Sequence, residues 1–252
     1  SEDETYLGMA LAGAVADDMQ KYKQISSMGF ASSYRISTLG SDGELLAHRL
    51  GYQYVLKGKI SLVNDSYIVE LTLTDSLGKS PWSSRFEKSP GDFSNIPGEI
   101  INRIITDLNI VSKNDQHSSA KISNGNVTTD AYRSYLQGKE KSYRLTDQSS
   151  REALQFFRNA IASNEKFSAA MAEAALVQAA RAEQGWDNNR TAFEQAKQWA
   201  EIAIGLDGSS TAGRIALANV LLNRHDYDGA KRELETASDA SPNNSQLSFA
   251  KA

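Results

Sequence analysis

Residues able to do acid–base or metal chemistry are few and widely spaced in this 252-residue chain. It has no cysteine, which excludes disulfides, thiolate zinc sites and cysteine nucleophiles together. His48, His117 and His225 are its three histidines, and none falls at the HxxxH or HxH spacing of a metal site. Asp17 and Asp18 are adjacent, but helix neighbours point about 100° apart, so a solvated face is expected there. With no nucleophile elbow, P-loop, dinucleotide fingerprint or HExxH motif, we predict no catalytic activity, no metal and no cofactor.

The other distinctive side chains are expected to have structural roles. His225 lies in the segment NRHDYDG and is expected at an exposed turn, with a pH-sensing role as the alternative. Trp82 is expected in the core of a sheet. Trp186 and Trp199 are expected to pack near a turn, and exposed anchors are the alternative.

Composition is that of an ordinary globular protein, with 40% hydrophobic and 23% charged residues. The net charge of −4 argues against a basic surface that binds nucleic acid. No apolar run approaches the roughly 18 residues that a membrane span needs. The chain opens with the acidic SEDETYLG rather than a signal peptide, and an opening at Ser1 is expected of a piece of a longer protein.

The elements that must position any site differ between the two halves of the chain. Residues 1–110 alternate between helical and strand patterns, which predicts an α/β or α+β domain of about four strands and three helices. The predicted helices begin with an apolar repeat at Leu7, with Ser41 and with an isoleucine-rich stripe at Ile100. The predicted strands are 24–30, 54–60, 67–75 and one around Trp82, and Asn64-Asp65 joins the second to the third.

Residues 111–128 read VSKNDQHSSAKISNGNVT and show no periodicity. Structureless loops longer than about 12–15 residues are uncommon inside compact domains. The segment is therefore predicted to be a linker between two domains.

Residues 129–252 are helical in pattern throughout, with an internal repeat. Ala203 and Ala237 are 34 residues apart, as are Gly208 and Pro242, and this is the period of tetratricopeptide repeats. Such repeats need small residues where paired helices cross. The residues that fit are Gly138, Ala153 and Ala160 (with Phe157 as the large residue), Ala175, Ala196 and Ala203, and Ala218, Ala230 and Ala237. Insertions of about three and about nine residues are needed in the first two copies, so we predict about three repeats and a final helix.

A partner-binding groove follows from the likeness to tetratricopeptide repeats, whose first helices line a concave surface. The candidate groove residues are Tyr132, Tyr135, Lys139 and Tyr143 in the first repeat, Leu176 in the second, and Asn219 and Asn223 in the third. Tyrosine and asparagine suit peptide recognition, because rigid amphipathic rings combine with amide hydrogen bonds to a backbone. The alternative is that the tyrosines pack against the preceding domain or face solvent.

The first domain also resembles a known family. Gly51, Tyr54, Val55, Leu56, Gly58, Asp75 and Trp82 occur in the order of a Gly-x-x-Tyr-Val-Leu-x-Gly strand, a hairpin and a Trp-centred strand. This segment resembles a TolB-like amino-terminal domain, which bacterial signalling proteins place ahead of tetratricopeptide repeats. The resemblance implies a small domain with a mixed sheet. Since family members begin with an apolar strand that is not seen after Ser1, the first strand is expected to be missing.

The same resemblance implies a function. It favours a sensory and protein-interaction region, as in the C-terminal part of a CadC-like, membrane-linked transcriptional regulator. The alternatives are the regulatory region of a class III adenylate or guanylate cyclase and an envelope-associated scaffold. The expected partner is a protein or peptide in the repeat groove, without direct nucleic-acid binding, and a homodimer stays open. The expected location is the periplasm, with the cytoplasm as the alternative.

Overall fold

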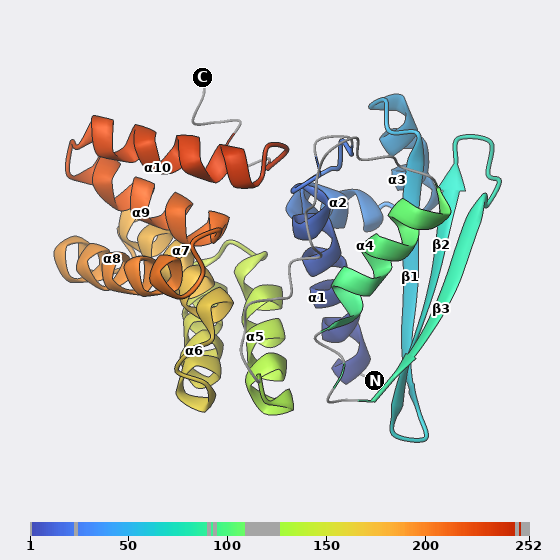
Figure 1. Cartoon of the computed structure of the whole chain (residues 1–252), viewed down its shortest axis with the longest axis horizontal. Coiled ribbons are helices and arrows are strands. Elements are labelled where there is room, and N and C mark those ends of the chain that lie inside the picture. Colours follow the sequence, from blue (N-terminus) through green and yellow to red (C-terminus); the bar gives the residue numbers. More distant parts are fainter. Residues whose placement is uncertain are drawn as a thin grey trace. The chain divides into compact units, whose positions relative to one another are not determined.

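A computed structural model of the chain describes residues 2–22, 25–89, 92, 95–108, 127–244 and 247 (Figure 1). The chain divides into two compact units, Ser1–Lys121 and Ile122–Ala252. Of the predicted linker, 111–128, only the last two residues lie within the described part, so the linker stays a prediction. The described residues of the first unit contain a sheet and four helices, and those of the second unit contain six helices.

The sheet of the first unit is antiparallel across its described strands, in the order β1 (Tyr54–Val63), β2 (Ser66–Asp75) and β3 (Trp82–Lys88). Val63 pairs with Ser66 across the two-residue turn Asn64-Asp65. Both turn residues have positive φ, 48° and 60°, as a type I′ hairpin turn requires. The hairpin predicted from the sequence is confirmed, whereas the mixed sheet is replaced by an antiparallel one in the described residues.

The strand predicted at 24–30 is wrong for the residues that the structure describes. Residues 25–29 form no strand, and Phe30 begins helix α2 (Phe30–Ser37); residue 24 lies outside the described part. Gly29 is extended, with φ −60° and ψ 146°, and precedes the first turn of α2. A short apolar run can adopt extended backbone without becoming a strand, because ladder pairing depends on a neighbour that the local sequence does not specify.

Three further helices belong to the first unit: α1 (Glu2–Met19), α3 (Ser41–Arg49) and α4 (Ile96–Asp107). In Figure 1, α1 and α4 lie beside the sheet, and α1 contacts both β1 and α4. Their predicted apolar stripes form the core with the inner face of β2. The buried members are Leu7, Leu11 and Val15 of α1, Ile100, Ile101 and Ile104 of α4, and Val69, Leu71 and Leu73 of β2.

Polar contacts attach α4 to β3. Trp82 is buried, as predicted, and its Nε1 donates a hydrogen bond of 2.9 Å to Asp107 Oδ2. That hydrogen bond, together with one from Arg103, lowers the pKa of Asp107. Lys88 Nζ also lies 2.8 Å from Glu99 Oε1. The end of the sheet and the last helix of this unit are therefore joined at two positions.

The second unit consists of helical hairpins (Figure 1). They are α5 (Thr129–Ser142) with α6 (Asp147–Ser163), α7 (Ser168–Glu183) with α8 (Asn189–Leu206), and α9 (Thr211–Asn223) with α10 (Tyr227–Ala240). Each helix contacts the next along the chain, and α7 also contacts α5 and α9. Of the predicted final helix, 245–252, only Leu247 lies within the described part, and it is buried.

Local sequence explains where these helices begin. Five of the six have an N-cap side chain that accepts a hydrogen bond from the backbone N–H three residues later. The capping residues are Thr128, Thr146, Asn188, Ser210 and Asp226. At Thr146 the cap is reciprocal, because the Ser149 hydroxyl also accepts from the Thr146 backbone.

Small residues lie where the paired helices approach most closely. Gly138 of α5 faces Phe157 of α6, and a Cβ atom on Gly138 would lie 2.6 Å from the phenyl ring. The alanines predicted for helix crossings, Ala153, Ala160, Ala175, Ala196, Ala203, Ala218, Ala230 and Ala237, are all at most 1% exposed. Their predicted burial is confirmed, and the hairpins pack through short side chains.

Candidate functional site

The seven predicted groove residues do not share one exposed surface. Tyr132 and Lys139 are buried, Tyr135, Tyr143, Leu176 and Asn219 are half-buried, and Asn223 is exposed. All lie on the first helices of the hairpins, except that Tyr143 is the C-cap of α5. Their role in partner binding stays a prediction, and their observed contacts are described next.

Lys139 takes part in a buried ion pair. Its Nζ lies 2.7 Å from Glu173 Oε1, and the two side chains are only 6% and 14% exposed. The ammonium also lies 5.3 Å from the centroid of the Tyr143 ring. This pair joins α5 to α7. It has a structural role, because removing one partner would leave the other charge buried without a partner.

Tyr132 and Tyr135 belong to an aromatic cluster. Their ring centroids are 5.9 Å apart, and the Tyr135 ring lies 6.1 Å from Phe157 and 5.1 Å from Phe167. Such pairs contribute about 0.5–1.5 kcal/mol each beyond the area that they bury. Leu176 likewise packs beside two buried apolar clusters, one around Ala175 and one around Ile215 and Ala237. The remaining predicted groove residues are the two asparagines of α9, of which Asn219 is half-buried and Asn223 is exposed.

A buried arginine network lies at the α7–α8 turn, which sequence reasoning missed. Arg181 is 2% exposed and donates to both carboxylate oxygens of Asp187, from Nε at 2.8 Å and from Nη2 at 2.9 Å. Its Nη1 donates to the Asp147 carbonyl at 2.9 Å and to Ser150 Oγ at 2.6 Å. The hydrogen bonds that Asp187 accepts, chiefly from Arg181 and also from Gln178, lower its pKa. The network fixes the start of α6 against the end of α7.

The sequence did contain a signal for this network. The insertion of about nine residues lies near this turn, and α8, which follows it, has 18 residues. Trp186 lies there with its ring centroid 6.0 Å from the Arg181 guanidinium, but it is 36% exposed, so the alternative of an exposed position describes it better than the predicted packing. Trp199 is half-buried and lies 5.6 Å from Arg158, which agrees with packing. His225 is exposed at a turn with φ 62°, as predicted.

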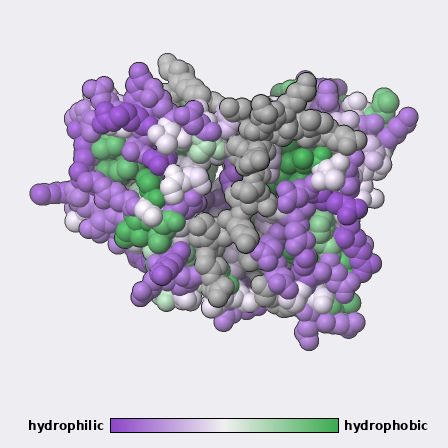
Figure 2. All heavy atoms as spheres, in the orientation of Figure 1, coloured by the Kyte–Doolittle hydropathy of each residue, from purple (hydrophilic) through white to green (hydrophobic). Residues whose placement is uncertain are grey.

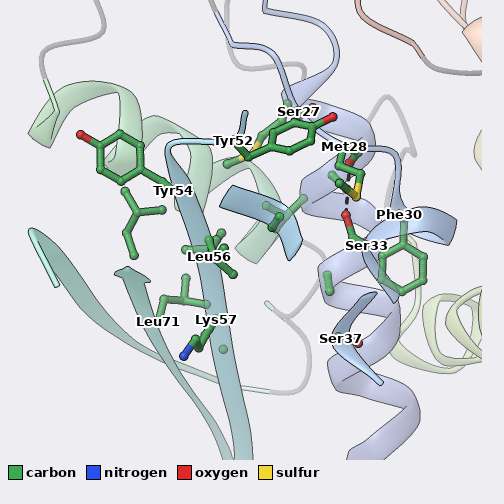
Figure 3. A pocket seen from close by; sticks show the side chains of 18 of the residues that line it. Ser27, Met28, Phe30, Ser33, Ser37, Tyr52, Tyr54, Leu56, Lys57 and Leu71 are labelled. Carbon is green, nitrogen blue, oxygen red and sulfur yellow. Dashed lines mark hydrogen bonds between the residues drawn. The ribbon is translucent and has the colours of Figure 1, made fainter. Parts of the chain in front are cut away.

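The first unit contains a cavity of about 1360 Å³ between its helices and β1 (Figure 3). The small residues Gly8, Ala12 and Ala16 of α1 line it. Each follows a buried residue of the Leu7, Leu11 and Val15 stripe, so they form an adjacent stripe at the same four-residue spacing. On α1 the cavity is therefore lined both by this stripe of small residues and by larger apolar residues, among them Met9, Leu11 and Met19.

The lining of the cavity is mainly apolar, with hydroxyl groups. In Figure 3, Leu56 and Leu71 project from the strands, and Met28 and Phe30 lie on the helical side. The lining hydroxyls are those of Ser26, Ser27, Ser33, Ser37, Tyr34, Tyr52 and Tyr54. Charged lining residues are Glu44, Lys57 and Lys59, and the first two form an ion pair with each other. This chemistry suits the binding of apolar groups with hydrogen bonds at the margin, rather than proton transfer.

The residues considered above for metal binding have other contacts in the structure. Asp18 pairs with Lys21 at 2.5 Å, and His48 Nδ1 lies 2.8 Å from the carbonyl of Tyr52. His117 lies outside the described residues. Within the described ranges, no three His, Asp or Glu side chains are grouped to hold a metal ion. In that same part of the chain, no helix has the length and apolarity that a membrane crossing requires.

Comparison with family models and with curated proteins yields no match for this chain. The assignment of a function therefore rests on the residues and on the geometry described above.

Proposed function

We propose that this chain is a sensory and protein-interaction region of a bacterial signalling protein and performs no catalysis itself. In this proposal a TolB-like unit precedes a tetratricopeptide-repeat array, and both report to an output domain elsewhere in the protein, as in CadC-like membrane-linked regulators. The region would then lie in the periplasm. The order of the units, a sheet unit followed by helical hairpins, supports this arrangement.

The observation that carries the proposal is the packing of the helical hairpins through small buried residues. Gly138 against Phe157 and the buried alanines at a 34-residue spacing, such as Ala203 and Ala237, are what a repeat array needs. Arrays of this kind build extended surfaces from repeated first helices, and they use those surfaces to bind partners.

Asn219 and Asn223 are the best remaining candidates for contact with a partner. They lie four residues apart on α9, so they share one helix face. Neither is among the buried residues at a helix crossing. Their amides can donate to and accept from an extended peptide backbone.

The test is selection of peptide ligands on the immobilised 252-residue chain from a random dodecapeptide phage library. The affinity of the selected peptides is then measured by fluorescence anisotropy for the wild type and for an Asn219→Ala, Asn223→Ala double variant. We expect the double variant to bind about tenfold more weakly or worse, because two amide contacts are lost.

The matched control is a Lys231→Ala, Glu235→Ala double variant. These residues also lie four apart, on α10, and their side chains are 74% and 64% exposed. The control should bind like the wild type. If the asparagine variant and this control bind with equal affinity, partner binding through Asn219 and Asn223 of α9 is contradicted.

A further inference from the structure

The cavity of the first unit is long as well as large. Its volume of about 1360 Å³ exceeds the roughly 300–1,000 Å³ of a typical small-molecule pocket. The residues Tyr54–Ile60 of β1 all line it, which is about 20 Å of strand. Residues of α1 between Gly8 and Met19 also line it, over about 17 Å of helix. Because α1 and α3 both contact β1, helices as well as the strand form its walls, and an elongated small molecule suits this space.

Methionine is concentrated in the lining of this cavity. The chain has four methionines, and Met9, Met19 and Met28 all line the cavity. Methionine is flexible and polarisable, so it adapts to apolar ligands of varied shape. Figure 2 shows a mostly hydrophilic surface with separate apolar patches, so a continuous lining of this kind differs from most of the surface drawn. The lining therefore suits a flexible alkyl chain.

The charged residues of the lining already have partners within the chain. Glu44 and Lys57 form an ion pair with each other. Lys59 lies directly opposite Glu70 in the sheet, and opposite charges at such positions attract. A charged ligand would lose its hydration on entering the cavity without gaining a free counter-charge, which is unfavourable. The lining therefore favours an uncharged ligand.

One buried hydroxyl in the lining has no hydrogen-bond partner among the described residues, and this is Ser27 Oγ. Ser33 and Ser37, which Figure 3 shows with it, donate to the carbonyl oxygens of Met28 at 3.4 Å and of Tyr34 at 2.7 Å. Buried hydroxyls are nearly always hydrogen-bonded, because losing water without gaining a partner is unfavourable. A hydroxyl or carbonyl group on a ligand would supply the partner that Ser27 lacks in this part of the chain.

We propose that the cavity binds an uncharged lipid with a single alkyl chain, such as a monoacylglycerol or a long-chain alcohol. The alkyl chain lies among the methionines along α1 and β1, and the hydroxyl or ester group of the lipid hydrogen-bonds to Ser27 Oγ. This site belongs to the first unit and is independent of partner contacts through Asn219 and Asn223 of α9.

The probes are three molecules of equal chain length and different charge: monolauroylglycerol, laurate and dodecylammonium. Each is titrated below its micellar concentration into the whole 252-residue chain and followed by isothermal titration calorimetry. Monolauroylglycerol is expected to bind at least about tenfold more tightly than either charged probe. Equal affinity for the three probes would overturn the proposal. Binding of none would mean that the cavity holds only water, and would overturn it as well.

A matched pair of serine variants tests the hydrogen bond. Ser27→Ala should bind monolauroylglycerol about threefold to tenfold more weakly than the wild type. Its Tm without lipid should not fall, because the lost hydroxyl has no partner among the described residues. Ser33→Ala should keep the wild-type affinity, since the Ser33 hydroxyl already donates to Met28. A lower Tm of Ser27→Ala with unchanged affinity would show that Ser27 supports the fold rather than the lipid, and would contradict its assignment.

A second pair of variants tests the position of the alkyl chain. Ala16→Phe places a ring in the cavity, whereas Ala14, also half-buried on α1, is not one of the lining residues. Ala16→Phe should weaken monolauroylglycerol binding at least about tenfold, and Ala14→Phe should bind like the wild type. Circular dichroism checks that both variants fold, and if Ala16→Phe does not, the serine pair decides. Equal affinity of the two phenylalanine variants would mean that the lipid binds elsewhere.

Discussion

Gly138→Ala sets two opposing effects of known size against each other. In an exposed helix interior, replacing glycine by alanine stabilises by about 1 kcal/mol, because the unfolded chain loses freedom and the helix gains propensity. At Gly138, however, the added Cβ would lie 2.6, 2.7 and 3.0 Å from three atoms of the Phe157 ring. Carbon atoms in contact prefer about 3.5–4.0 Å, so the overlap approaches 1 Å.

Relief of this overlap is difficult because Phe157 is fully buried. Its ring packs among Ala153, Leu154, Ala174 and the half-buried Tyr135. Overpacking of such a site typically costs about 1–3 kcal/mol, and this overlap is at the upper end. After the gain in helix propensity, we expect Gly138→Ala to destabilise the second unit by about 1–2 kcal/mol. This corresponds to a fall in Tm of several degrees, on the order of 2–8 °C per kcal/mol.

The assay is the thermal loss of helical circular dichroism, with Gly205→Ala as the matched control. Gly205 lies in α8, and nothing would lie within 4 Å of its added Cβ. This control should have an unchanged or slightly higher Tm. A rise in Tm for Gly138→Ala equal to that of Gly205→Ala would mean that α5 and α6 do not cross as closely as described.

Two further predictions concern the second unit. Ala230→Leu, at a 1% exposed position of α10, should lower the free energy of unfolding of the second unit by about 1–3 kcal/mol. Asp228→Ala, at the exposed start of that helix, should change it by no more than about 0.5 kcal/mol. Equal Tm shifts for the two variants would show that the repeat register is wrong. Since the pKa of Asp187 is lowered in the folded state, its ion pair with Arg181 contributes stability above about pH 4 that is lost as the pH falls through the folded pKa. Tm should therefore drop more steeply on acidification in the wild type than in Asp187→Asn, and parallel slopes would contradict this assignment.

Features that depend on nearby residues were predictable from the sequence. The Asn64-Asp65 turn, the helix Ser41–Arg49 and the strand around Trp82 follow from turn residues and from short-range periodicity. The burial of Ala203 and Ala237 was predicted from their 34-residue spacing, because a repeat can be recognised in the sequence without knowledge of which segments are in contact. By contrast, residues 25–29 had a strand-like pattern but form no strand, because ladder pairing depends on a neighbouring segment that local sequence does not specify.

The candidate site was less predictable, for a related reason. Lys139 and Tyr132 were predicted to line a groove, but they are buried beside Glu173 and a cluster of aromatic rings. Register along a helix specifies a direction, whereas exposure depends on what a different helix places in that direction.

The sequence by itself therefore determined the β1–β2 hairpin, the helical character of the second unit and the small residues at the helix crossings, because each depends on local conformation or on a repeated period. Only the tertiary structure decided that Arg181 is buried beside Asp187 and the start of α6, and that a cavity borders β1. Those features arise where segments far apart in the chain meet. The Asp147 carbonyl that Arg181 binds is 34 residues away, and the cavity is lined by Gly8, Ala12 and Ala16 of α1 together with residues of β1.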